Sequence, residues 1–204
     1  MSVVEKVARF EQTQHAPVFH TMKRRRSIGH VSQVQPSQAE IERLLEAATY
    51  APSHHVTEPW RFFVLTGSAR QALGDVMAAS LRTRLEQNNG EHLQQKLVRE
   101  RAKPLRAPVI IVVAITGVRH LPGYPIECVE AAAAAIQNML LAAEEMGLAT
   151  VWRTGDPAYD PTVKRWFGLQ PDDLIVGLVY VGYPLNTRPI RVPTHFSVKT
   201  IWLS

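Results

Sequence analysis

The stretch AAAAAIQNMLLAAEEMGLATVWRTG, residues 131–155, decides much of the fold. Small and apolar residues run through its first part almost without interruption, which predicts a helix from about Glu127 to Met146 that ends at Gly147. Because this helix has so little polar surface, we expect it to be buried on most sides, and a second copy of the chain would be an economical cover. The residues that follow, Ala149–Arg153, predict a strand.

The rest of the chain alternates between helical and strand-like patterns. Helices are predicted where apolar residues recur at helical spacing, over 37–50, 68–81 and 160–167. Strands are predicted at β-branched and apolar runs, over 59–65, 108–115 and 174–183. Ser37 and Glu40 predict a capping box, and the polar segment 82–103 is expected to hold a helix, a turn and a second helix. This order of elements indicates an α+β or α/β domain with a central sheet.

Composition fits one folded domain, since 46% of the 204 residues are hydrophobic and 20% are charged. We divide the chain into an N-terminal extension, residues 1–20, and a single domain, residues 21–204. The one cysteine, Cys128, excludes an internal disulfide framework and a CxxC site, and the histidines lack metal-ligand spacing, so no metal is expected. No secretory signal is visible, and the apolar runs are too short or too interrupted to span a bilayer. This favours a cytoplasmic protein with no membrane role.

The formal net charge is +5, and the positive excess is concentrated at Lys23–Arg26. Such a cluster can bind nucleic acid, an anionic surface or an anionic cofactor. The chain has no recognisable nucleic-acid reader motif and few aromatic residues suited to stacking on bases, so we expect no nucleic-acid partner. A basic nucleic-acid-binding module stays a remote alternative, and it would bind with a steep dependence on salt.

Three short motifs could hold an anionic ligand. They are Arg25-Arg26-Ser27, His54 in the loop APSH, and Arg153-Thr154-Gly155. The first motif offers two guanidinium groups and a hydroxyl to a phosphate. The second lies in a loop between a predicted helix and a predicted strand, and the third follows the end of a predicted strand, where open sheets commonly bind ligands. Each also has an ordinary structural interpretation: a solvated basic patch, a turn and a strand end. The sequence lacks the GxGxxG, P-loop, HExxH and GxSxG signatures of other enzyme classes.

Taken in order along the chain, these motifs resemble the nitroreductase family of FMN-dependent oxidoreductases, most closely its YdjA-type NAD(P)H nitroreductase branch. The matching segments are RRS at 25–27, APSH at 51–54, PWRFFVL at 59–65, APVIIVV at 107–113, AAAAAIQNMLLAAEEMGLATVWRTG at 131–155 and LIVGLVYVGYP at 174–184. The likeness extends from about Met22 to Pro184. Its most specific part is IQNMLLAAEEMGL leading into the tryptophan and the arginine.

The resemblance implies an α+β fold, with a nitroreductase-like mixed sheet flanked by helices, in an intertwined homodimer whose two FMN sites use both subunits. The implied FMN contacts are Arg25, Arg26, Ser27, His54, Arg153, Thr154 and Gly155, with His54 reaching the flavin from the same or the partner subunit. NADH or NADPH would pass hydride to flavin N5, and a small oxidised acceptor, such as a nitroaromatic or a quinone, would follow in a ping-pong cycle that needs no catalytic side chain. A flavin-using dehydrogenase and a flavin-fragmenting enzyme of the same fold stay as alternatives.

One departure from the family pattern concerns the first motif. Many relatives read RRSIR, whereas Gly29 and His30 follow Ile28 in this chain. The missing contact is lost, passed to His30, or taken by a C-terminal residue such as Arg188 or Arg191.

Overall fold

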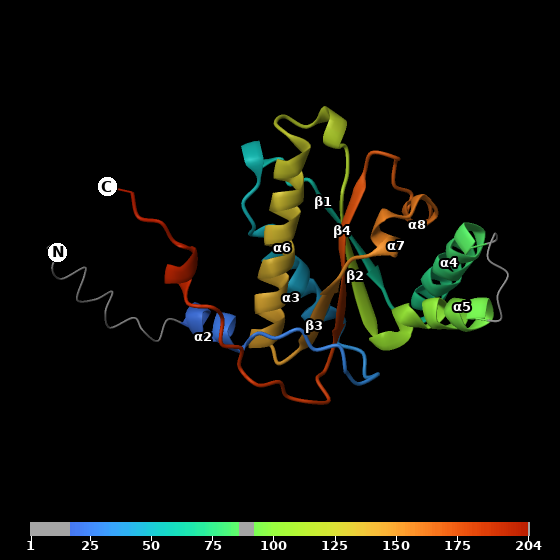
Figure 1. The fold of residues 1–204 in the computed structure, drawn as a ribbon, viewed down its shortest axis with the longest axis horizontal. Helices are drawn as coiled ribbons and strands as arrows, with labels where there is room; N and C mark the ends of the chain where they lie inside the picture. Colours follow the sequence, from blue (N-terminus) through green and yellow to red (C-terminus); the bar gives the residue numbers. More distant parts are fainter. Residues whose placement is uncertain (1–16, 86–91, 204) are drawn as a thin grey trace, which may run out of the picture.

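The computed structural model describes residues 17–85 and 92–203, and its centre is a four-stranded sheet in the order β1-β2-β4-β3 (Figure 1). The strands are β1 (Trp60–Leu65), β2 (Val109–Ile115), β3 (Ala149–Arg153) and β4 (Leu174–Gly182). Neighbouring strands are antiparallel throughout. Among the described residues, parallel pairing occurs only at the isolated bridge between Ser27 and Thr150, so the strands themselves do not form a mixed sheet.

Helices cover both faces of the sheet, which is why every residue of β2 is buried. The helices on one face are α3 (Gln38–Thr49) and α6 (Pro125–Glu145), and those on the other are α4 (Gly67–Leu85) and α8 (Pro161–Trp166). Since side chains alternate along a strand, Ile111 and Val113 join the core beneath α3 and α6, while Ile110 and Val112 join the core beneath α4 and α8. The predicted α+β class is confirmed.

The helix ends follow the sequence signals closely. Ser37 is the N-cap of α3, its backbone N–H donates to the Glu40 carboxylate at 2.8 Å, and its hydroxyl accepts from the Glu40 N–H at 3.3 Å. These bonds complete the predicted capping box, and the Ser37 hydroxyl, which donates to the Glu40 carboxylate at 2.7 Å, lowers the pKa of Glu40 together with the backbone N–H. At the end of α6, Gly147 takes a left-handed φ of 72°, as predicted for the residue after a helix.

Two helices differ from the prediction. Helix α8 matches the helix expected at 160–167, and a short helix that was not predicted, α7 (Asp156–Tyr159), precedes it, with Asp160 ending the first helix and capping the second. The helix expected at 68–81 continues to Leu85 in α4. After it, α5 (His92–Ala102) packs against α4, while residues 86–91 of the predicted turn lie outside the described part.

The long helix α6 corrects a second expectation. With 21 residues it is long and apolar enough, by length and composition alone, to cross a membrane, although the sequence suggested that its apolar run is too interrupted. In this fold it is a core helix, and one stripe of its residues, from Cys128 through Ile136 to Ala143, packs on the sheet and α3. Its other side is half-exposed, so burial on most sides is not achieved within one chain.

The described chain begins with a helix that packs beside the end of α6 (Figure 1). Helix α2 (Pro17–Arg24) carries Lys23 and Arg24 in its last turn, while residues 1–16 of the expected extension lie outside the described part. After β4 the chain returns past α2 and ends in a C-terminal arm, residues 190–203, that leaves the body of the domain. The arm exposes a row of large apolar side chains: Ile190, Val192, Phe196, Val198, Ile201, Trp202 and Leu203.

Candidate functional site

Two of the predicted motifs lie side by side in the structure. The segment that follows α2 runs along the edge strand β3, where Ser27 bridges Thr150 and the Ile28 N–H donates to the Thr150 carbonyl at 2.9 Å. Farther along, a Cβ built on Gly29 would lie 3.2 Å from Nη2 of Arg153. The RRS motif and the WRTG motif, far apart in sequence, therefore lie side by side at the edge of the sheet, and the surface that they form between two flanking cavities is called the groove.

On one side of this groove, the C-terminal segment closes a cavity of about 340 Å³. Arg24, Arg26 and Arg188 line it together with the end of α6. Arg24 pairs with Glu144 through Nε and Oε1 at 3.3 Å, and Nη1 of Arg26 donates to the carbonyl of Pro189. Arg26 thus holds the C-terminal segment against the RRS motif, a role that its sequence position did not reveal.

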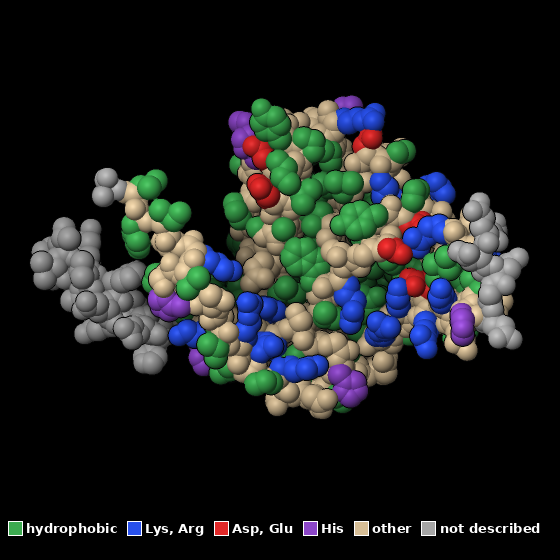
Figure 2. Space-filling view, in the orientation of Figure 1, with side chains coloured by type: hydrophobic (Ala, Val, Ile, Leu, Met, Phe, Trp, Pro, Cys, Tyr) green, Lys and Arg blue, Asp and Glu red, His purple; other side chains and the backbone are tan. Residues whose placement is uncertain are grey.

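On the other side, Arg153 faces a second cavity, of about 300 Å³. Lys103, Arg106 and Arg153 bring positive charge to it, and the guanidinium of Arg153 lies 5.6 Å from the centre of the Tyr180 ring, in a cation–π contact. Glu100 is close enough to oppose this charge at Tyr180, but it is largely buried and paired with Lys103 at 2.5 Å. Figure 2 shows Lys and Arg side chains gathered along the lower part of the molecule, from the C-terminal segment to the α4–α5 side.

Tyr180 adds a hydrogen-bond donor to this cationic cavity. The residue is only 5% exposed, and burial raises the pKa of its hydroxyl, although Arg153 and Arg106 oppose that rise. In the part of the chain that the structure describes, the hydroxyl has no hydrogen-bond partner. The sequence interpretation missed Lys103, Arg106 and Tyr180. The available signal was a pair of cations directly before the buried strand β2.

Hydrogen bonds and an ion pair hold the turn after the WRTG motif against α4. Thr154 and Gly155 lead into α7, and Asp160 then accepts two backbone N–H bonds at the start of α8 and a hydroxyl bond from Ser80. Arg84, also on α4, places Nε 3.8 Å from the Asp160 carboxylate. Burial opposes ionisation of Asp160, but these bonds outweigh it and lower the pKa of the carboxyl. Helix α4 therefore fixes the position of Thr154 and Gly155.

His54 lies at the opposite end of the domain. It belongs to the single turn η2 (His54–Val56), with Nε2 3.8 Å from Oε2 of Glu127 at the start of α6, whereas Arg24 contacts Glu144 at its end. Glu127 and Glu144 are 17 residues apart along α6, roughly 25 Å at a rise of about 1.5 Å per residue. One chain therefore does not bring His54 to the groove that holds the other predicted residues.

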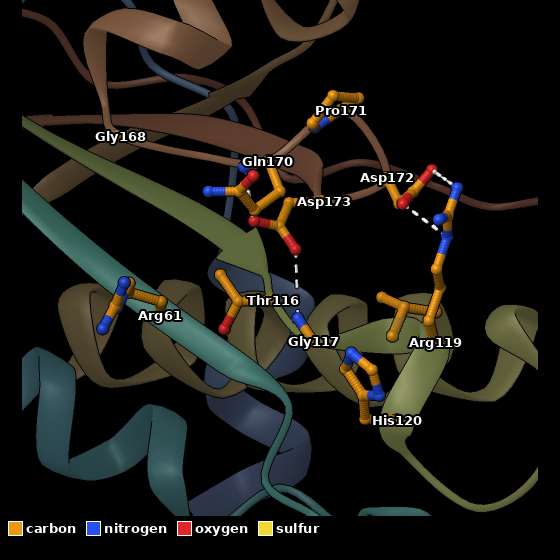
Figure 3. A pocket seen from close by; sticks show the side chains of 11 residues that line it. Arg61, Thr116, Gly117, Arg119, His120, Gly168, Gln170, Pro171, Asp172 and Asp173 are labelled. Carbon is orange, nitrogen blue, oxygen red and sulfur yellow. Dashed lines mark hydrogen bonds and ion pairs between the residues drawn. The ribbon is translucent and has the colours of Figure 1, made fainter.

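A larger cavity, of about 560 Å³, lies between the ends of β1 and β2 and the loop before β4 (Figure 3). None of the residues predicted from sequence lines it. Its buried carboxylate, Asp173, accepts from the backbone N–H groups of Gly117 and Gln170 at 3.0 and 2.8 Å, and Arg119 pairs with Asp172 across its rim. These polar groups hold two loops together.

Comparison with known proteins identifies the family. The family model described as the nitroreductase family matches residues 22–183. The protein YdjA of Escherichia coli (strain K12), whose name places it among the NAD(P)H nitroreductases, is 32% identical over 162 residues, which cover 78% of this chain and 84% of YdjA.

Solved structures show the same architecture. The nitroreductase-like family protein from Bacillus cereus has a TM-score of 0.76 at 27% identity, with 91% of this chain and 95% of that chain covered. A Desulfovibrio desulfuricans protein described as a nitroreductase in complex with FMN has a TM-score of 0.68 at 27% identity, with 92% of this chain and 97% of that chain covered. Because the family model matches residues 22–183, which are most of this chain, the chain belongs to the nitroreductase family.

Proposed function

We infer that this chain is an FMN-dependent oxidoreductase that takes electrons from NADH or NADPH and passes them to a small oxidised molecule. We propose that FMN lies on this groove, against the RRS motif and the end of β3. The observation that carries this proposal is the contact of the two motifs, through the Ser27–Thr150 bridge and the approach of Arg153 to Gly29.

The residues of the groove fit the chemistry of FMN. A phosphate suits the guanidinium of Arg25 and the exposed hydroxyl of Ser27, because charge-assisted bonds to such groups are short and strong. Gly29 has no side chain, and this lets the guanidinium of Arg153 lie close to its backbone, next to the proposed phosphate contacts. The cationic cavity beside Arg153 suits the oxygen-rich end of the flavin ring, and we propose Thr154 and Gly155 as backbone contacts next to it.

Bound FMN would supply the redox chemistry, and the chain would supply position and charge. Lys103, Arg106 and Arg153 would stabilise negative charge on the ring end bound beside them, in a cavity where electrostatic interactions are less screened than in water. Tyr180 can donate a hydrogen bond there, since the raised pKa keeps its hydroxyl protonated. No side chain is needed as a nucleophile.

We propose further that the working form is a homodimer and that His54 serves the groove of the partner copy. A second α6 packed in the opposite direction would bring the start of one helix to the end of the other, and this would remove the separation of roughly 25 Å. The half-exposed side of α6 and the apolar C-terminal arm support this arrangement, because contiguous exposed apolar surface marks interaction sites.

Acceptors of this enzyme are proposed to be nitroaromatics, quinones or similar small molecules, with no nucleic-acid partner. The proposed compartment is the cytoplasm, where the buried, unpaired thiol of Cys128 would stay reduced.

Absorption spectroscopy tests the function directly. The natively purified protein should be yellow, release FMN on heat denaturation, and bleach when NADH or NADPH is added without oxygen. Arg25→Ala should weaken FMN binding, whereas Lys23→Ala, a change of equal charge on the exposed side of α2, should not. A colourless protein that does not quench the fluorescence of added FMN would overturn the proposal.

A further inference from the structure

Glu127 makes two contacts at the start of α6. Its Oε2 accepts the backbone N–H of Tyr124 at 2.8 Å and so caps the first turn of the helix. The same oxygen lies 3.8 Å from Nε2 of His54, at ion-pair distance when the imidazole is protonated. Both side chains are partly exposed, so the pair faces solvent or a ligand and is not a core contact.

The backbone on both sides of this pair takes conformations that few residues tolerate. Gly123 has a φ of 92°, and a Cβ on it would lie 2.7 Å from Cδ2 of His54 and would also clash with Oε2 of Glu127. Of the four residues that follow His54, three have left-handed φ values: His55 at 51°, Val56 at 55° and Glu58 at 43°. For a β-branched residue such a φ is strained, and strain of this kind persists where the surroundings impose it, commonly at functional sites.

A cavity of about 420 Å³ opens beside the pair, lined by Ser53, His54 and the carboxylates of Glu127 and Glu130. The ring of His55 lies edge-on to that of His54 at 4.1 Å, and Tyr124 is exposed nearby. These are the titratable groups that the structure places around His54, from its own turn, from α6 and from the loop before it. The imidazole thus stands between a polar cavity and a carboxylate.

We propose that Glu127 is a positioning residue that holds the imidazole of His54 as a proton donor to the acceptor bound in this cavity. The substrates are then acceptors that must take up protons as they are reduced, namely nitro compounds and quinones. This inference rests on the proposed function and on the dimer, in which the cavity of one copy faces the FMN groove of its partner.

The reaction balances with the partners already named. NADH or NADPH supplies two electrons and one proton, and His54 supplies the second proton and regains it from water. A quinone thereby becomes a hydroquinone as both oxygens form O–H bonds. A nitro group becomes a nitroso group as one N–O bond breaks and the oxygen leaves as water.

The test separates the two halves of the catalytic cycle in His54→Gln and Glu127→Gln, with His92→Gln and Glu46→Gln as exposed controls. Glutamine at position 127 keeps the helix cap and removes only the charge, so the variant should fold. Anaerobic stopped-flow absorbance gives the rate of reduction by NADH or NADPH. It then gives the rate of re-oxidation by benzoquinone and by ferricyanide, which accepts an electron without a proton.

On FMN-saturated protein, the ratio of the benzoquinone rate to the ferricyanide rate should fall by roughly 100-fold in His54→Gln, the usual size of a lost proton transfer, because a lost FMN contact would change both rates alike. Glu127→Gln should lose less, because the imidazole stays in place without the carboxylate that orients it, and the pH profile of its benzoquinone rate should differ from that of wild type. Equal losses with both oxidants, or none with either, would overturn this inference alone. A protein that NADH and NADPH both fail to reduce would overturn the proposed function and this inference with it.

Discussion

The guanidinium of Arg153 occupies the space beside Gly29: a Cβ on that glycine would lie 3.2 Å from Nη2. The sequence left open whether the contact of the missing arginine after Ile28 is lost or passes to His30 or to a C-terminal arginine. In the structure the ring of His30 is bonded to the Asn186 side chain at 3.1 Å. We therefore propose that Arg153, from the neighbouring strand, supplies the contact.

Exchange of the two residues tests this substitution. Arg153→Ala should weaken FMN binding about 10- to 100-fold, because a hydrogen bond to a charged group contributes roughly 1.5–3 kcal/mol. Adding Gly29→Arg to that variant should restore much of the affinity, since the new side chain can fill the vacated space. Fluorescence titration of FMN measures both effects, with Arg43→Ala on the exposed side of α3 as a control. Failure of the double variant to recover would show that Arg153 acts in another way.

A shared site predicts complementation between subunits. Arg25→Ala and His54→Gln should each lower quinone turnover, because one removes a proposed FMN contact and the other the proposed proton donor. A heterodimer with one variant in each subunit, isolated with two affinity tags, has one site with both residues intact. It should recover about half of the wild-type activity per dimer. If both residues serve the same chain, the heterodimer should be no more active than the two variants.

The C-terminal arm should control assembly. A chain that ends at Pro189 keeps the carbonyl that Arg26 contacts and loses the exposed apolar side chains beyond it. We expect this chain to be a monomer with weakened FMN binding, because the arm would no longer bury that surface against a partner. Light scattering after size-exclusion chromatography measures the mass. Trp202→Ser, which removes the largest of these side chains, should show a smaller shift toward monomer. A truncated chain that stays dimeric would show that other surfaces suffice.

Much of the fold follows from local sequence, and the site follows only in part. The apolar run of β2, the capping box at Ser37 and the position of Gly147 each reflect chemistry within a few residues, and the structure confirms them. The contact of Gly29 with Arg153 depends on the placement of one segment along a strand far away in sequence. The distance of His54 from the other motifs depends on the length and direction of α6. The hydrophobic periodicity of the sequence predicts this helix but does not say where the other motifs lie relative to its two ends.

The cationic cavity shows the same limit. Lys103 and Arg106 lie at the end of a polar, helical segment, where lysine and arginine are ordinarily solvated. Only the fold shows that they line one cavity with Arg153 and the hydroxyl of Tyr180. Tyr180 belongs to β4, whose sequence otherwise predicts apolar core. Short-range patterns identify elements and caps, whereas a binding cavity is assembled from side chains whose proximity is a property of the tertiary structure.

Asp160 links the stability of the domain to pH. Its pKa is lowered in the folded chain from the ordinary value of 3.8, so the carboxylate stabilises the fold at pH values above that value, and the stabilisation is lost as the pH falls through the lower, folded-state pKa. Asp160→Asn keeps a capping oxygen but removes the negative charge, which faces both Arg84 and the hydroxyl of Ser80. Asp160→Ala removes the cap as well.

We expect the free energy of unfolding at pH 7 to fall by about 1 kcal/mol in Asp160→Asn and by about 3 kcal/mol in Asp160→Ala, because a buried charged partner and a helix cap each contribute on this scale. Urea unfolding at pH 7 and in steps below pH 4 measures these differences, and that between wild type and Asp160→Asn should shrink as the wild-type carboxyl takes up its proton. A difference that is constant over this range would show that the charge of Asp160 does not stabilise the turn that positions Thr154 and Gly155.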